Sequence, residues 1–232
     1  MIVQQNHPGT AKDAYDSIKK HIVTCEYKPG ERFNVEKLAE QFRLSATPIR
    51  EILYQLSAEK LVSVIPRTGF FMRSFNESEI RDLYETNCLV LSGAACLLGS
   101  DVCWALASED HLLSRARMFF QGVEPLEGYS LTQLTSDFFS VIASMSRNEE
   151  IEFLVSNLND RLYFVRDCEK EVFGDIAVKL KAMCDCLDRS DLDGFCGQLN
   201  EYHQTRIAQM PLILRVLKNE RERLGCRQFV GR

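Results

Sequence analysis

The chain has 232 residues, of which 45% are hydrophobic and 26% charged, and its formal net charge is −5. These proportions are typical of a globular protein with one or two domains. The hydrophobic runs are too short to cross a bilayer, and the first ten residues contain no hydrophobic signal region. We therefore expect a cytoplasmic protein and exclude membrane-spanning and secreted classes.

The charge is unevenly divided along the chain. Residues 1–75 carry 11 Lys and Arg against 8 Asp and Glu, net +3, whereas residues 76–232 carry 17 against 25, net −8. A locally basic segment is what a small domain needs to approach nucleic acid. We expect two domains, residues 1–75 and residues 76–232, of which the first binds DNA.

The nine cysteines are odd in number, and in an intracellular chain they are expected to be reduced and mostly buried. Cys184 and Cys186 form a C-x-C pair, but no second pair accompanies them to complete a zinc site. We expect neither a disulfide framework nor a metal site from the cysteines.

Residues 1–60 predict three short helices. The apolar spacing favours a helix over residues 11–22, which the Pro29-Gly30 pair must follow as a turn. A second helix is expected over residues 35–42, with Asn34 as its N-cap. Ser45 is a suitable N-cap for a third helix, whose buried face would contain Ile49, Leu53 and Leu56.

A β-hairpin is predicted directly after these helices. Residues 61–65 are rich in β-branched side chains, residues 66–69 contain a proline and a glycine, and residues 70–72 form a second apolar run. Gly69 would relieve the backbone at the tip. Two helices joined by a tight turn and followed by a hairpin predict a winged helix-turn-helix.

The start of the third helix has the residue types that read DNA. Hydroxyls and backbone N–H groups at a helix N-terminus can bind a phosphate, and a long cation one turn later can reach a base. The hairpin tip and the exposed face of the preceding helix supply further polar and basic side chains. This reasoning selects Lys37, Ser45, Thr47, Arg50, Arg67 and Thr68 as DNA-contact residues.

Each of these arginines also has an ordinary structural interpretation. Arg50 could be a solvated helix charge that pairs with Glu51 or Glu59, and Arg67 could simply occupy a turn. The order of the whole segment, from the first helix to the winged hairpin, favours the DNA-binding interpretation.

The remainder of the chain predicts helices only. Apolar stripes of helical period cover residues 80–98, 131–145, 151–165 and 192–217, and weaker ones cover residues 108–121 and 171–188. Residues 73–78 are expected to be a linker. The fold class is therefore mainly α, an N-terminal winged helix-turn-helix plus a C-terminal all-α bundle of six or seven helices.

Several polar residues interrupt or flank the stripes of this bundle. Asn87 and His203 occupy stripe positions and Arg161 flanks another stripe, where a buried polar group needs a partner. One interpretation is structural, with Asn87 bonded to a neighbouring helix, His203 satisfied in the core and Arg161 paired with an acid. The other is that these residues, with Asp137, line an effector pocket.

The N-terminal segment resembles the DNA-binding domain of the GntR family of bacterial regulators, and the helical remainder resembles the FadR-type (FCD) subgroup. The resemblance implies operator contacts at the positions of Ser45, Thr47, Arg50, Thr68 and Gly69. One position departs from the family, because Ala46 stands where an arginine commonly follows the serine. The matching runs are Lys28-Pro29-Gly30-Glu31-Arg32-Phe33, Leu38-Ala39, residues 44–51, Leu56, Leu61-Val62 and residues 67–70.

The subgroup resemblance implies a dimerising bundle that holds an effector, often beside a metal ion. The first two metal-ligand positions fall on Thr135 and Phe139 or, with a shift of one residue, on Ser136 and Ser140. Neither pair supplies the expected carboxylate and imidazole, and only His203 lies close to a later ligand position. We expect the metal site to be absent, and because Asn87 stands where an arginine is common, we expect a less acidic effector or none.

The resulting hypothesis is a homodimeric, ligand-responsive repressor of a metabolic operon that binds double-stranded operator DNA without a cofactor. An alternative regulator would use its helical domain only for dimerisation or partner contact. An enzyme is not expected. Cys184 or Cys186 with His203 could be imagined as a nucleophile and base, but no phosphate loop or nucleophile elbow supports that role.

Overall fold

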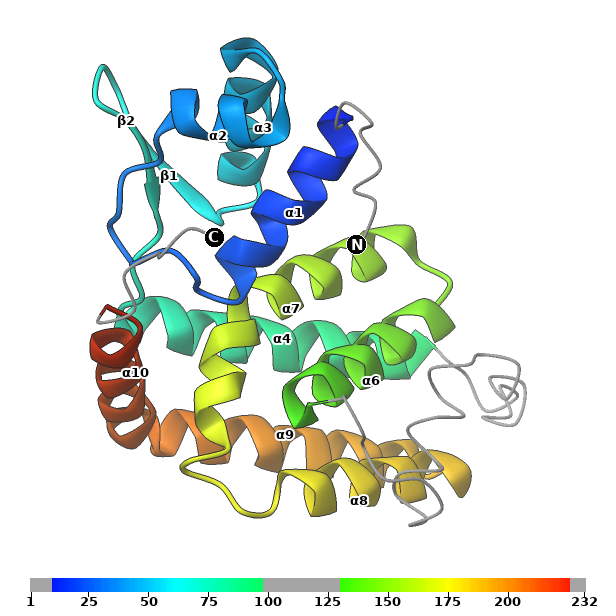
Figure 1. Cartoon of the computed structure of the whole chain (residues 1–232). Helices are drawn as coiled ribbons and strands as arrows, with labels where there is room; N and C mark the ends of the chain where they lie inside the picture. The colour runs from blue at the N-terminus through cyan, green and yellow to red at the C-terminus, as the bar shows by residue number, and fades with distance from the viewer. Residues whose placement is uncertain (1–9, 98–129, 226–232) are drawn as a thin grey trace, which may run out of the picture. The chain divides into compact units, whose positions relative to one another are not determined.

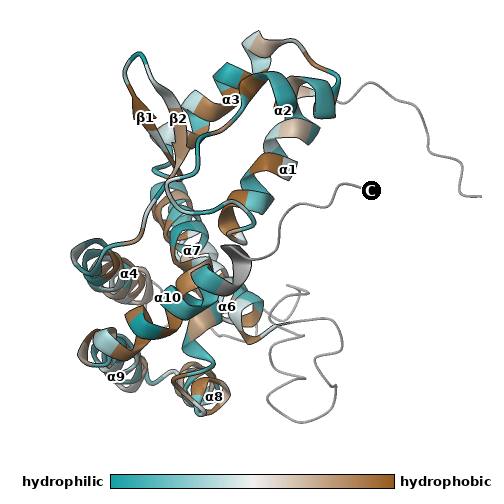
Figure 2. Ribbon diagram, turned by 60° about the vertical axis from the view of Figure 1, so that its left-hand side comes forward, coloured by the Kyte–Doolittle hydropathy of each residue, from teal (hydrophilic) through white to brown (hydrophobic). Residues whose placement is uncertain are grey.

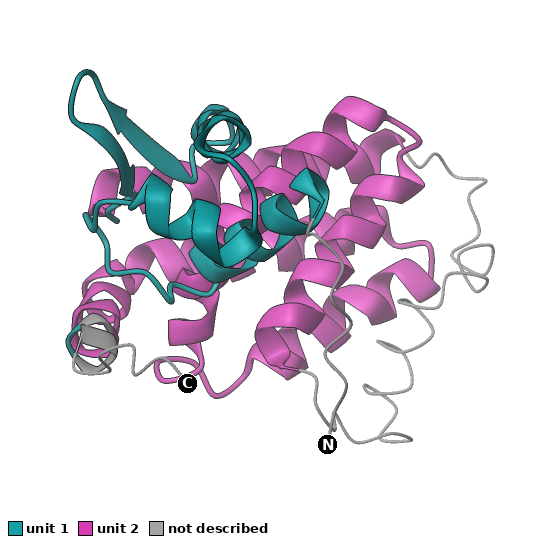
Figure 3. Ribbon diagram, turned by 45° about the horizontal axis from the view of Figure 1, so that its top comes forward, with its two compact units in different colours: residues 1–75, 221–232 teal, residues 76–220 magenta. Residues whose placement is uncertain are grey.

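The structure is a computed structural model that describes residues 10–97 and 130–225 (Figure 1). The chain divides into two compact units, residues 76–220 and residues 1–75 together with 221–232 (Figure 3). We call the first the helical unit and the second the winged unit. The helix expected over residues 108–121 lies outside the described residues.

The winged unit begins with the three helices that the sequence predicted: α1 Ala11–Val23, α2 Val35–Phe42 and α3 Ala46–Ala58. Thr10 starts α1 with a capping box, because its hydroxyl accepts from the Asp13 N–H while the Asp13 side chain accepts from the Thr10 N–H. These local bonds satisfy N–H groups that have no helical acceptor and so define where the helix starts.

The turn between α2 and α3 is tight. Asn34 caps α2 by accepting from the Lys37 N–H at 2.9 Å, as predicted. Arg43 ends the helix in the left-handed region, with φ 55°, and the Leu44 N–H returns to the Ala39 carbonyl at 2.9 Å. α3 packs against both α1 and α2. Its buried face is the predicted one, formed by Ile49, Leu53 and Leu56.

The wing is the predicted hairpin. β1 Val62–Ile65 and β2 Gly69–Met72 pair antiparallel, with Val62 opposite Met72 and Ile65 opposite Gly69. Gly69 has φ 131°, a conformation that side chains rarely adopt. The segment after the Pro29-Gly30 turn pairs with the other edge of β2, since the Phe33 N–H donates to the Phe70 carbonyl at 2.9 Å.

The described part of the helical unit consists of helices that surround a common core. α4 packs against α6, α7 and α9, and α8 packs against α9. Figure 2 shows hydrophilic and hydrophobic residues on each of these helices, as amphipathic helices require. The helices are α4 Glu77–Leu97, α6 Leu131–Met145, α7 Glu149–Glu169, α8 Ile176–Asp188, α9 Leu192–Ala208 and α10 Met210–Gly225, whose residues from 221 onward are grouped with the winged unit.

The structure confirms the predicted fold class and corrects the C-terminal helix boundaries. The stripe expected over residues 192–217 is divided, because α9 is capped at Gln209 and α10 starts at Met210. Pro211 explains the break, since proline has no N–H to donate and its ring clashes with the preceding turn. None of the helices in the described residues combines the length and apolarity that a membrane span requires.

Candidate DNA-binding site and polar core

The N-terminus of α3 presents polar groups to solvent. Ser45 is the N-cap, but its side chain makes no capping hydrogen bond. Ser45 and Thr47 are both exposed, and Ala46 between them is half-buried. The N–H groups in the first turn of a helix have no helical acceptor. Together with the two hydroxyls they form a surface suited to a phosphate oxygen.

Arg50 extends from α3 one turn beyond Thr47. Its side chain is 53% exposed, and its Nη2 lies 3.7 Å from Oε1 of Glu36 on α2. This partner differs from the expected Glu51 or Glu59; Glu59 instead accepts from Tyr15 and Lys19. An exposed ion pair of this kind stabilises a protein by little, so DNA can displace Glu36 from Arg50 at low cost.

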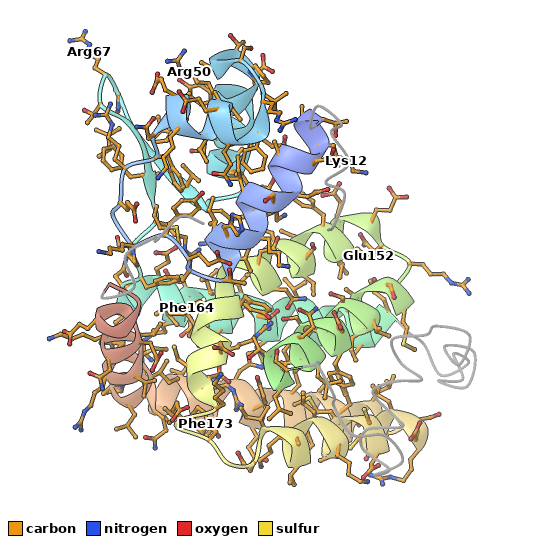
Figure 4. The ribbon with its side chains drawn as sticks, in the orientation of Figure 1. Lys12, Arg50, Arg67, Glu152, Phe164 and Phe173 are labelled. Atoms are coloured by element: carbon orange, nitrogen blue, oxygen red, sulfur yellow. The ribbon has the colours of Figure 1, made fainter. Side chains whose placement is uncertain are left out.

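The wing tip carries the second basic group. A turn closed by the Thr68 N–H and the Ile65 carbonyl, at 3.0 Å, places Arg67 in the left-handed region with φ 62°. Arg67 and Thr68 are exposed, as is Lys37 on α2. Figure 4 shows Arg67 extending from the wing tip and Arg50 from α3 at the same end of the winged unit.

A cavity of about 400 Å³ is lined by residues of α3, of β2 in the wing, and of the segment that leads into α2. It contains a residue that the sequence analysis did not select, Arg32, although Arg32 directly follows the Pro29-Gly30 turn. Arg32 lies so close to Gly69 that a Cβ there would be 3.2 Å from the Arg32 Nε. Gly69 therefore allows the approach of Arg32 as well as the wing turn. The lining residues are Arg32, Phe33, Asn34, Val35, Glu36, Arg50, Gly69 and Phe70.

In the helical unit, the structure brings two of the four effector candidates into contact. Asn87 on α4 and His203 on α9 are completely buried, and the Asn87 Nδ2 lies 3.0 Å from the His203 Nε2. The His203 Nδ1 lies 2.8 Å from the Leu199 carbonyl. Because a carbonyl can only accept, Nδ1 carries the proton and Nε2 accepts from Asn87.

His203 is held in its neutral form. Burial lowers the pKa of His203 from 6.5 to about 3. The hydrogen bond to the Leu199 carbonyl raises this pKa, whereas the positive charges of Arg166 and Arg206 lower it further. The unfolded chain takes up this proton near pH 6.5, whereas the folded chain takes it up only near pH 3. Protonation therefore favours the unfolded chain in that interval, and stability is lost as the pH falls.

We predict that His203→Gln reduces the pH dependence of stability. Between about pH 7 and about pH 5.5, the histidine alone should lower the free energy of unfolding by about 1 kcal/mol. Urea titrations of both proteins at the two pH values measure the difference. An equal change in the native protein and the variant would show that His203 does not contribute.

The other two effector candidates have partners of their own. Arg161 Nη2 lies 3.2 Å from Oε1 of Glu79, and the Asp137 Oδ1 accepts from the Gln133 Nε2 at 2.8 Å. Their side chains are half-buried. These contacts agree with the structural interpretation of Arg161, which paired it with an acid.

A buried ion pair was missed by the sequence analysis. The Arg206 Nε on α9 donates to Oε2 of Glu169 on α7 at 2.8 Å, and each side chain is only 1% exposed. The hydroxyls of Tyr84 and Tyr202 also donate to this carboxylate. A weak signal was available, because Arg206 lies on the predicted α9 stripe and Glu169 is one turn beyond Val165.

The expected metal positions do not suit a metal ion. The Thr135 hydroxyl donates to the Leu131 carbonyl, Phe139 has no ligand atom, and the Ser136 hydroxyl accepts from Arg166. A buried guanidinium at this place repels a metal cation. Within residues 10–97 and 130–225, no group of three or more His, Cys, Asp or Glu side chains is arranged to hold a metal.

The winged unit has the architecture of a winged helix-turn-helix, which is typical of DNA-binding regulators. Residues 10–72 match the family described as bacterial regulatory proteins, gntR family. The chain is 28% identical to the Nta operon transcriptional regulator of Aminobacter aminovorans over 145 residues, covering 62% of this chain and 67% of that protein. It is 31% identical to the transcriptional repressor GlaR of Escherichia coli over 110 residues, 46% of this chain and 50% of that one.

Two solved structures share the fold. A GntR transcriptional regulator from Rhodococcus sp. RHA1 aligns with a TM-score of 0.66 at 18% identity, over 86% of this chain and 96% of that one. Escherichia coli McbR/YncC aligns with a TM-score of 0.66 at 20% identity, over 87% and 97%. The chain is a DNA-binding transcriptional regulator whose residues 10–72 match the gntR family. These relatives are regulators and not enzymes, in agreement with the expectation from the sequence.

Proposed function

We propose that this regulator binds a specific operator as a homodimer and responds to a small effector, as a repressor of the FadR-type (FCD) subgroup. The observation that carries the DNA-binding part is the polar N-terminus of α3 beside an exposed Arg50, with Arg67 and Thr68 on the wing. The helix would read the major groove while Lys37 and the wing contact the backbone. The protein would act in the cytoplasm, where its DNA is.

Fluorescence anisotropy tests sequence-specific binding. A labelled duplex from the region upstream of the protein's own gene is titrated in about 0.15 M salt and competed with a random duplex of equal length. We expect the specific duplex to bind at least about 1,000-fold more tightly. If the two duplexes compete equally, the claim of sequence reading is contradicted.

Homodimerisation is tested by light scattering and by operator spacing. The particle should have twice the mass of one chain. Two half-sites read by a dimer lie about 10 base pairs apart, so inserting about 5 base pairs moves them to opposite faces of the duplex. Affinity should then fall toward that of a single half-site. A monomer that is indifferent to the insertion would contradict the proposal.

The alternative, a helical unit that serves only for dimerisation or partner contact, is favoured by the paired states of Arg161 and Asp137. It predicts that no small molecule stabilises the protein. A ligand that binds only the folded chain must raise its melting temperature. Melting temperatures measured with small organic acids, amino acids and sugars therefore distinguish a ligand-responsive helical unit from one that serves only for dimerisation or partner contact.

A further inference from the structure

Arg32 lies on the short segment that pairs with the outer edge of β2. Its backbone stands opposite Phe71 in an antiparallel bridge. The next residue continues the pairing, because the Phe33 N–H donates to the Phe70 carbonyl at 2.9 Å. The backbone of Arg32 is therefore fixed to the wing, although the residue itself is exposed.

The side chain of Arg32 is held against the wing by shape. A Cβ at Gly69 would lie 3.2 Å from the Arg32 Nε and 3.5 Å from its Nη2, so the guanidinium group packs on the bare backbone of Gly69. Within residues 10–97 and 130–225 this guanidinium makes no ion pair, whereas Arg50 pairs with Glu36. Arg32 is thus a fixed cation whose N–H donors are available to a ligand.

The cavity of about 400 Å³ in the winged unit has Arg32 on its wing side and Arg50 on its α3 side. Glu36 is the third charged residue of the lining. Two guanidinium groups and one carboxylate give the lining a formal charge of +1. Because Glu36 already pairs with Arg50, the charge of Arg32 is the one left to attract an anion.

The path of a DNA duplex supplies that anion. When α3 lies in the major groove and the wing reaches the neighbouring groove, one sugar-phosphate strand must run between them, because this strand is the boundary of both grooves. The cavity is lined by residues of α3 and of β2, so it lies where that strand passes. Each nucleotide of the strand carries one negatively charged phosphate.

We infer that the Arg32 guanidinium binds a backbone phosphate of the DNA strand that passes between α3 and the wing. The inference rests on the proposed function, because it adds a contact to the same DNA interface. A guanidinium group presents parallel N–H groups that match two oxygens of a phosphate. The contact carries no base information and instead fixes the register of the protein on the duplex.

Arg32 differs in this role from the arginine at the wing tip. Arg67 extends freely from the tip (Figure 4), so its side chain must be ordered when DNA binds. The Arg32 side chain already rests on Gly69, and ordering it further costs less conformational entropy. Arg32 therefore sets the distance at which the strand lies from α3, and so how deeply Arg50 enters the major groove.

The first test is the salt dependence of DNA binding by the full chain. Arg32→Ala should weaken binding to the operator duplex and to a random duplex alike, by roughly 10-fold at about 0.15 M salt. The slope of log affinity against log salt concentration should fall by about 0.9, the value for one phosphate contact. Lys12→Ala, which removes an exposed cation at the start of α1, should keep the native slope.

A conservative variant separates a direct contact from a supporting role in the wing. Arg32→Lys keeps the charge but lacks the planar fork, so it should retain the native slope and bind more weakly than the native protein. Circular dichroism and melting temperatures show whether each variant is folded. Both variants should melt within about 2 °C of the native protein, because the replaced residue is exposed.

The second test locates the phosphate. In a series of operator duplexes, one phosphate at a time is replaced by an uncharged methylphosphonate. At one position the replacement should weaken binding of the native protein and have little effect on Arg32→Ala, because the partner of that phosphate is already missing. A variant that only disturbs the wing would still be weakened by the replacement at that position.

The inference is overturned if folded Arg32→Ala keeps the native salt slope, or if every methylphosphonate that weakens the native protein weakens the variant equally. Failure of the proposed function gives a different result, in which operator and random duplexes compete equally for the native protein. The slope on random DNA still tests Arg32 in that case, because phosphate contacts do not depend on sequence.

Discussion

Replacing Glu169 with glutamine should lower the free energy of unfolding by about 3–5 kcal/mol, because the change leaves the Arg206 charge buried and unpaired. The two side chains are each 1% exposed and meet at 2.8 Å. Tyr84 and Tyr202 also donate to the same carboxylate. An amide retains the size of the side chain but not the charge that balances Arg206.

Urea unfolding followed by circular dichroism measures this loss as a fall in the transition midpoint. Glu171→Gln is the matched control, because it removes an exposed carboxylate two residues along the chain. A combined Glu169→Gln and Arg206→Met variant removes both charges and should recover part of the stability. A loss below about 1 kcal/mol in Glu169→Gln would contradict the importance of the pair.

The pKa values of Tyr84 and Tyr202 agree with their role as hydrogen-bond donors to the Glu169 carboxylate. Burial raises the pKa of Tyr84 well above 10, and the Glu169 carboxylate contributes in the same direction. Burial also raises the pKa of Tyr202 to about 12. Both hydroxyls therefore remain protonated donors at neutral pH, where they stabilise the carboxylate together with Arg206.

Arg50→Ala should weaken operator binding by about 1–3 kcal/mol, or about 5- to 150-fold, if Arg50 reads a base. Arg50 is exposed, and its ion pair with Glu36 is long, at 3.7 Å, so its removal should leave the folded winged unit intact. Binding to random DNA should change much less. Anisotropy titrations on both duplexes measure the two effects.

Two further measurements make this result specific. If Arg50 contacts a phosphate instead, affinity should fall for both duplexes and the salt dependence should decrease by about one unit of slope. Lys12→Ala is the control, because Lys12 is exposed at the start of α1, away from Arg50 and Arg67 in Figure 4. Unchanged operator affinity in Arg50→Ala would remove Arg50 from the DNA-reading residues.

The winged unit was predictable because its structure is determined locally. Ser45 follows a tight turn, and Ile49, Leu53 and Leu56 repeat at helical spacing, so one short segment contains both the cap and the buried face. The hairpin likewise depends on residues that are close in sequence. The role of Arg32 beside Gly69 was missed, since this contact joins residues far apart in the chain.

The polar core of the helical unit could not be predicted in the same way. Periodicity indicates which residues of one helix face inward, but it does not indicate which partner another helix will supply. Arg206 lies on the predicted stripe, yet its partner Glu169 is on α7 and Tyr84 is on α4. The interruption of residues 192–217 is different, because Pro211 was visible in the sequence and the apolar stripe outweighed it in the prediction.

Arg67 illustrates a compromise between folding and recognition. Its φ of 62° lies in the left-handed region, which glycine and asparagine adopt more readily. For other side chains this conformation costs about 1–2 kcal/mol of free energy. The residue is exposed, so packing does not compensate for that cost. A wing selected for rigidity alone would have a smaller residue at this tip. With an arginine at this position the folded protein is less stable than it would be with a glycine or an asparagine, but the wing tip has an exposed guanidinium group.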